Sequence, residues 1–353
     1  MNPRFLMPMK TTVKKLLKQA EQKRLASRHT EAIPLILKAK RLCARDKPLA
    51  MECHISLAHA CRMTGRYKKA AEAYQAAYNI AAKLKDNTTQ TDCLVGMGLS
   101  LRGLGFHREA IFFFNRALTG YKKTGDATGQ AFAVWAKAGA LRIRGDLKGA
   151  IRMFNEAKGI FQRLRDQGGV GYCLTGLGGA SRIAGKTEDS LRFYKQANGL
   201  FKRQRDRFGV AYSYCGIANA LRMKGDFKGS LKYFDMARKN YRKIGDKVSY
   251  AYTLWGEANS YLFLLKPSLA EKDIKDAEGL FRETRDNRGL ILCSISRCQM
   301  GCLKNGRKDS LTNALVSAYN DAKEAGFRVE ALYAKSVLKA FLKGPETLPL
   351  NLA

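Results

Sequence analysis

The chain has 353 residues, of which 46% are hydrophobic, so it is long enough to bury a large core. Its 64 Lys and Arg against 30 Asp and Glu give a formal net charge of +34, which favours negatively charged partners. The N-terminus lacks an apolar stretch before its first lysines, and no run of about 18 apolar residues follows. We therefore expect no signal peptide, no membrane span and a cytoplasmic location.

The first part of the chain is predicted to contain a short tail over residues 1–12 and then a degenerate repeat. This repeat begins at Val13 and places Ala20, Ala32 and Ala39 at the same positions that alanine occupies in the clearer repeats further on.

Residues 51–290 divide into six blocks of forty that align without a gap. Position 27 is Ala and position 36 is Asp in every block, and position 15 is Gly in all but the sixth, which has Leu265. Position 8 is always Ala or Gly, and position 24 is aromatic in five blocks. Columns of this kind in one register indicate an internal structural repeat.

Each block is predicted to form two helices, over positions 1 to 14 and 17 to 33. The glycine at position 15 can adopt the left-handed conformation that ends a helix. The Asp at position 36 can cap the helix that follows. Because one helix pair cannot cover its own apolar face, the pairs must stack.

The C-terminal part is predicted to contain a decayed repeat over 291–328, a capping helix over 329–343 and a tail over 344–353. The expected organisation is therefore a solenoid over 13–328, strong over 51–290, closed by the capping helix.

These columns resemble the tetratricopeptide repeat, and the forty-residue length and the "GDATG" segment at 125–129 resemble the repeats of kinesin light chain and of Leu-Gly-Asn spindle-orientation scaffolds. The resemblance implies an all-α, right-handed superhelical solenoid with a concave groove. The family is a general binding scaffold without shared chemistry, so the resemblance implies a binding protein and no enzyme.

The resemblance also implies which face of the first helix lines the groove. Positions 4, 7, 8 and 11 form the buried apolar stripe, while positions 2, 5, 9 and 12 lie on the second face, which faces the groove in this family. Position 12 is basic in repeat after repeat, and positions 2, 5 and 9 add aromatics and amides. The candidate ligand-binding residues are Arg24, Arg62, Arg102, Arg142, Arg182, Arg222, Phe132, Tyr172, Tyr212, Tyr252, Trp135, Trp255, Asn219 and Asn259.

Stacked helices lie about 10 Å apart, a distance that an extended peptide covers in about three residues. An acidic side chain at every third residue of an extended protein segment could therefore meet successive arginines. RNA or single-stranded nucleic acid is the alternative ligand, through the same arginines. The arginines could equally be structural, paired with the Asp at position 36 or stacked on the Tyr at position 2.

Basic clusters also recur near the end of the second helices, at 121–123, 162–165, 201–205 and 241–243. Cations there interact favourably with the helix dipole. Their repetition nevertheless predicts a positive stripe that could bind a polyanion with strong salt dependence.

The Cys and His residues give no sign of a cofactor, metal or catalytic site. The nine cysteines are scattered, which favours a reduced compartment. Cys293, Cys298 and Cys302 do not share one helix face and have no histidine nearby, so we expect buried apolar side chains rather than a zinc site.

Overall fold

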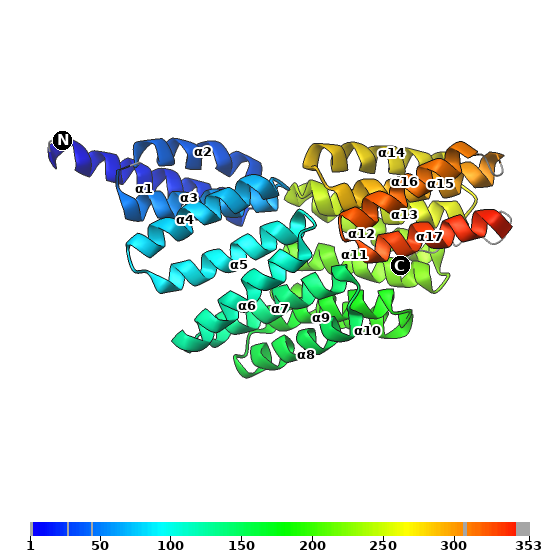
Figure 1. Cartoon of the computed structure of the whole chain (residues 1–353), viewed down its shortest axis with the longest axis horizontal. Helices are drawn as coiled ribbons and strands as arrows, with labels where there is room; N and C mark the ends of the chain where they lie inside the picture. Colours follow the sequence, from blue (N-terminus) through cyan, green and yellow to red (C-terminus); the bar gives the residue numbers. More distant parts are fainter. Residues whose placement is uncertain (1–2, 27, 44, 306–308, 344–353) are drawn as a thin grey trace. The chain divides into compact units, whose positions relative to one another are not determined.

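In a computed structural model, the structure describes residues 3–26, 28–43, 45–305 and 309–343, and all regular structure there is α-helical. The expected tail at 344–353, and residues 1–2 of the expected N-terminal tail, lie outside these residues. None of the helices in the described ranges is both long and apolar enough to cross a membrane. The helices pack in consecutive helix-turn-helix pairs, which confirms the all-α solenoid expected from the sequence (Figure 1).

The chain divides into two compact units, each described here by itself. Unit 1 comprises residues 1–136 and 244–246, and unit 2 comprises residues 137–243 and 247–353. The helices of unit 1 are α1 (Pro3–Leu25), α2 (His29–Leu42), α3 (Lys47–Met63), α4 (Tyr67–Lys83), α5 (Asn87–Gly103), α6 (His107–Thr124) and the first half of α7 (Ala127–Arg144).

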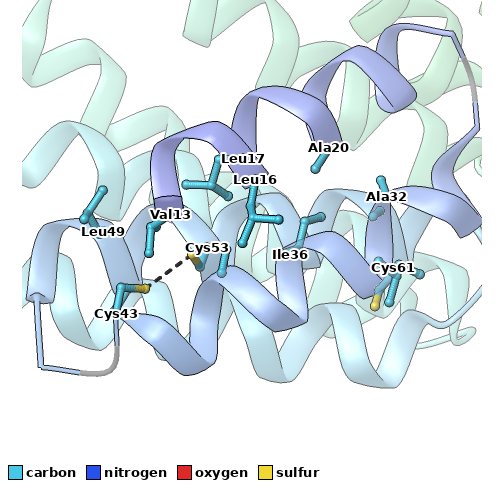
Figure 2. Packing of buried hydrophobic residues seen from close by; sticks show 14 of the residues in the cluster. Val13, Leu16, Leu17, Ala20, Ala32, Ile36, Cys43, Leu49, Cys53 and Cys61 are labelled. Carbon is cyan, nitrogen blue, oxygen red and sulfur yellow. Dashed lines mark hydrogen bonds between the residues drawn. The ribbon is translucent and has the colours of Figure 1, made fainter. Parts of the chain in front are cut away.

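The core at the start of unit 1 is built from small and branched side chains of α1, α2 and α3 (Figure 2). Val13 and Ala39 are fully buried in it. The thiols of Cys43 and Cys53 lie 3.5 Å apart in the same core. Helix α1 begins at Pro3, so it runs through the segment before Val13 that we expected to be a tail.

Unit 2 continues the pairwise packing to the end of the described chain. Its helices after α7 are α8 (Leu147–Arg163), α9 (Gln167–Ile183), α10 (Thr187–Arg203), α11 (Arg207–Met223), α12 (Phe227–Ile244), α13 (Lys247–Phe263), α14 (Pro267–Thr284), α15 (Asn287–Asn305), α16 (Asp309–Glu324) and α17 (Arg328–Lys343).

The turns between helices follow the glycines and aspartates that recur from repeat to repeat. The glycines at position 15 have φ between 73° and 91°, which is the left-handed conformation expected of them, and Leu265 adopts it too, at φ 55°. The aspartates at position 36 act as N-caps: the carboxylates of Asp86, Asp126, Asp166, Asp206 and Asp286 each accept a hydrogen bond from the backbone N–H three residues on.

The small and aromatic columns form the contacts between helices. The alanines at position 27 are fully buried, and the aromatic rings at position 24 are buried as well. Buried small side chains allow the two helices of a pair to approach closely, as the sequence predicted.

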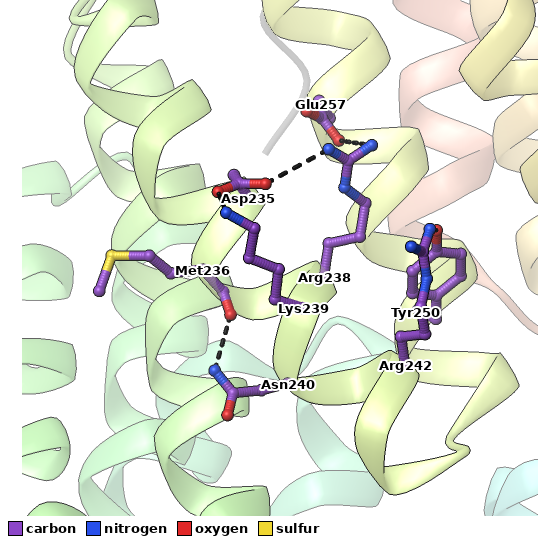
Figure 3. A network of polar contacts seen from close by, with 8 residues as sticks. All are labelled: Asp235, Met236, Arg238, Lys239, Asn240, Arg242, Tyr250 and Glu257. Carbon is purple, nitrogen blue, oxygen red and sulfur yellow. Dashed lines mark hydrogen bonds and ion pairs between the residues drawn. The ribbon is translucent and has the colours of Figure 1, made fainter.

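A polar network joins α12 to α13 inside unit 2 (Figure 3). Arg238 lies 3.4 Å from the carboxylate of Asp235 on its own helix and 3.6 Å from that of Glu257 on α13. Glu257 is buried, and its burial raises the pKa of its carboxyl to about 7. A buried carboxyl is therefore held beside one arginine within the helical core.

Candidate functional site

In unit 1, first-helix residues of three successive repeats line a pocket of about 300 Å³. Numbered within the forty-residue repeat, residues at positions 5, 9 and 12 on α3 meet residues at positions 2, 5 and 9 on α5 and the residue at position 2 on α7. These are the repeat positions that the sequence analysis assigned to the groove. The pocket-lining residues at these positions are Ile55, His59, Arg62, Asp92, Val95, Leu99 and Phe132.

Arg62 is the cation of this pocket. Its Nε is buried and has no hydrogen-bond partner among the described residues. Burial, and then the charge of Arg62, lower the pKa of His59 to about 4, so this imidazole is neutral at neutral pH. The pocket therefore presents one fixed positive charge beside a neutral ring.

Asp92, the acidic residue of the pocket, is committed to a neighbour. Its carboxylate accepts a hydrogen bond of 2.6 Å from the hydroxyl of Tyr121, and burial raises the pKa of its carboxyl.

The other position-12 arginines of unit 1 have local partners. Arg24 forms an ion pair with Glu21 on the same helix. Arg102 donates to the carbonyl of Ala136 and lies 5.9 Å from the ring of Trp135, which stacks on the more exposed Phe132.

In unit 2, Arg142 on α7 and Arg182 on α9 are half-buried. The Nε of Arg142, and both Nε and Nη1 of Arg182, are buried without a hydrogen-bond partner in the described chain. Burial raises the pKa of Tyr194 to about 12, and the charges of both arginines act in the opposite direction. The two guanidinium groups thus share one face around Tyr194.

Arg222 has a different environment, because it is fully buried. Its Nη2 donates to the Oδ1 of Asn219 at 3.2 Å, and its guanidinium lies 6.0 Å from the ring of Trp255. Burial lowers its pKa to about 9. The cation–π partners of Arg102 and Arg222 are thus the tryptophans at position 5, not the tyrosines at position 2.

The remaining candidates of unit 2 are engaged in the fold. Two tyrosines at position 2 donate to N-cap aspartates, Tyr172 to Asp206 at 2.8 Å and Tyr252 to Asp286 at 3.1 Å.

Trp255 is buried and donates to the hydroxyl of Ser296 at 3.0 Å. Asn259 is fully buried and donates to the carbonyl of Trp255. Asn219 donates to the carbonyl of Cys215, and Tyr212 stacks on Phe208.

Helix α17 adds residues to the same face that sequence analysis did not identify. Glu330 is fully buried and accepts from Nε of Arg288 at 2.7 Å. Tyr333 packs against the core of α13 and α14, and Arg182 and Arg222 act electrostatically on its hydroxyl. Arg328 lies against Gly145 at the end of α7. No repeat column contains Glu330, so its role depends on tertiary packing alone.

Cys293, Cys298 and Cys302 are buried, as the sequence predicted. Within the ranges that the structure describes, no group of three or more His, Cys, Asp or Glu side chains could hold a metal ion.

Consecutive helix pairs with an inner face of first helices define the class of this protein as an α-helical repeat solenoid. The sequence profile of the tetratricopeptide repeat matches residues 12–83 and 57–123, and the chain has the tetratricopeptide-repeat fold. No curated protein matches the sequence.

Several solved structures share this fold. The Rap conjugation gene regulator of the plasmid pLS20, in complex with the Phr* peptide, is 14% identical, with a TM-score of 0.69 over 91% of this chain and 97% of that one. A Rap protein complexed with competence and sporulation factor is 12% identical, with a TM-score of 0.61 over 94% and 98%. Aspartyl phosphate phosphatase F from Bacillus subtilis is 11% identical, with a TM-score of 0.57 over 94% and 89%. At these identities the likeness shows the fold alone.

Proposed function

We propose that this protein is a non-enzymatic scaffold that binds an acidic, extended protein segment along the arginines of its inner faces. The observation that supports this most strongly is the set of buried guanidinium nitrogens without a partner, on Arg62, Arg142 and Arg182. A buried donor that lacks an acceptor is costly, so an acceptor supplied by a ligand would be favourable.

A carboxylate is the acceptor that best fits these groups. It can accept two parallel hydrogen bonds from one guanidinium, and such charge-assisted bonds are stronger than neutral ones. The contact between Glu330 and Arg288 on the inner side of unit 2 is an intramolecular example of this chemistry.

An extended segment fits the repeat of the arginines. Arg142 and Arg182 occupy the same position of successive repeats, and first helices stack about 10 Å apart. About three residues of an extended chain cover that distance, so acidic side chains at every third residue would reach both. Two of the structural neighbours are complexes, one with the Phr* peptide and one with competence and sporulation factor, which is consistent with a binding role for the fold.

The proposal is tested with a fluorescent peptide that carries glutamate at every third residue. We expect Arg142→Gln with Arg182→Gln to weaken its binding by at least about tenfold, because each arginine loses a charge-assisted bond. The charge-matched control is Arg152→Ala with Lys195→Ala, which removes two exposed cations from α8 and α10.

Fluorescence anisotropy measures the affinities, and circular dichroism checks that both variants remain helical. Equal losses in the two double variants would contradict the proposal, as would equal binding of a peptide with glutamine in place of glutamate. Unfolding of the Arg142→Gln, Arg182→Gln protein would show that the two arginines are structural.

A further inference from the structure

The left-handed turn residue that follows each second helix is either glycine or a cation. Position 35 has positive φ in all six blocks of 51–290; two carry glycine, Gly125 and Gly245, and the others carry Lys85, Arg165, Arg205 and Arg285. Side chains other than glycine are disfavoured in this conformation. Because glycine serves in two of the repeats, the turn itself does not require a lysine or arginine.

In unit 2, two of these turn arginines belong to a larger exposed surface, which we call the cationic edge. It consists of cations at the ends of α8, α10 and α12. Its residues are Arg163, Arg165, Lys202, Arg203, Arg205 and Lys243.

The three helix ends of the cationic edge lie side by side. Gln204, at the end of α10, lies close to Gly168 in the first turn of α9, which follows the end of α8. The ring of Phe208, in the first turn of α11, lies 6.1 Å from that of Tyr241 near the end of α12. The helix ends that carry the six cations are therefore neighbours.

The charges of the cationic edge are not neutralised within the protein. In the part of the chain that the structure describes, none of its six side chains has a recorded ion pair, although Nζ of Lys202 lies 5.3 Å from the ring of Tyr214. The neighbouring acids are engaged elsewhere: Asp166 accepts from the N–H of Gly169, and Asp206 from Gly209 and Tyr172.

We propose that the cationic edge binds the phosphate backbone of single-stranded nucleic acid. Exposed cations without an acidic partner suit closely spaced phosphates, and counterions are released when the phosphates bind. At the end of α12, Arg242 donates to the hydroxyl of the half-buried Tyr250 on α13 at 2.9 Å, with its guanidinium 5.7 Å from the ring, and such a guanidinium–aromatic pair can stack on a base (Figure 3). An acidic peptide has no base to stack, so this pair favours nucleic acid. The site is separate from the inner faces and does not depend on their function.

The turn arginines Arg165 and Arg205 provide a test, because replacing them with glycine should change stability and binding in opposite directions. Arg165→Gly with Arg205→Gly removes two edge cations and relieves two left-handed side chains. We expect the melting temperature to rise while affinity for fluorescent oligouridine falls at least about tenfold near 0.1 M salt. The slope of log affinity against log salt should fall in magnitude by about 1.4, as expected for two lost phosphate contacts.

The charge-matched control is again Arg152→Ala with Lys195→Ala, which should change oligouridine binding by less than about threefold because neither residue contacts the phosphates. A second edge variant, Lys202→Gln with Arg203→Gln, leaves the turn backbone unchanged and should lose affinity as the glycine variant does. Equal losses in edge and control variants would overturn the proposal in favour of bulk charge. Edge-dependent binding of polyglutamate or of phosphatidylserine vesicles without binding of oligouridine would also overturn it.

Discussion

At the scale of single residues, glycines at position 6 of the first helix determine how closely successive repeats approach. A Cβ on Gly216 would lie 2.2 Å from the ring of Tyr194, and one on Gly96 would lie 2.3 Å from the ring of Tyr74. The same position in other repeats is occupied by Gly176 and Gly256, which face Phe154 and Phe234. The aromatic column at position 24 thus packs on the backbone of the following repeat.

Gly216→Ala is therefore expected to destabilise the protein. Alanine normally stabilises a helix by about 1 kcal/mol relative to glycine, but here the new methyl group displaces a buried ring, which costs about 1–3 kcal/mol. We expect a net loss of about 1 kcal/mol in the free energy of unfolding, measured by urea denaturation. Gly279→Ala is the matched control: no atom lies within 4 Å of its Cβ position on α14, so it should stabilise by about 0.5–1 kcal/mol. Stabilisation by both substitutions would contradict this account of the packing.

The position-12 arginines show that residues at the same repeat position can differ in burial and in partners. The column predicted that all of them lie on one face, yet Arg222 is fully buried while Arg24 forms an exposed ion pair. The difference arises from neighbours that vary between repeats, such as Asn219 beside Arg222. The N-cap aspartates and the turn glycines were predictable because their partners are backbone atoms a few residues away, which every repeat provides.

At the scale of helices, α17 is held to α15 by a buried ion pair. Glu330→Gln should remove the anion from the partly buried Arg288 and destabilise unit 2 by about 2–3 kcal/mol. Glu283→Gln, which breaks the exposed pair with Lys247, is the control and should change stability by less than about 0.5 kcal/mol. Urea denaturation compares the two variants. Equal effects would mean that the buried pair does not anchor α17.

The sequence placed a helix here correctly but could not reveal Glu330, because its partner comes from another helix.

The packing of α12, α13 and α14 is expected to depend on pH. Burial raises the pKa of Glu257 to about 7 and that of Asp273 to about 6, and Arg238 only partly opposes this. The folded protein therefore binds protons more tightly than the unfolded chain, and this stability is present below about pH 4.5 and is lost as pH rises to about 7.

Glu257→Gln should reduce the loss of folding stability that accompanies rising pH. Relative to the wild type, the variant should gain about 1–3 kcal/mol of stability between about pH 5 and pH 8. Urea denaturation at the two pH values measures the difference, and the carboxylates elsewhere in the chain cancel in the comparison. Parallel pH profiles for the two proteins would show that Glu257 does not titrate with a raised pKa.

At the scale of the whole molecule, the charge of +34 attracts any polyanion, so binding alone does not identify a site. Salt separates the two proposed sites. Nε of Arg142 and both Nε and Nη1 of Arg182 are buried, whereas the side chains of the cationic edge are exposed, and buried charges are screened much less than exposed ones. Raising salt from about 0.1 to about 0.5 M should therefore preserve most of the difference in peptide affinity between the wild type and Arg142→Gln, Arg182→Gln. The difference in oligouridine affinity between the wild type and Arg165→Gly, Arg205→Gly should shrink by about tenfold over the same range, because counterion release contributes less. Anisotropy titrations of both probes at both salt concentrations measure this, and two differences that shrink equally would mean that one diffuse electrostatic field accounts for both ligands.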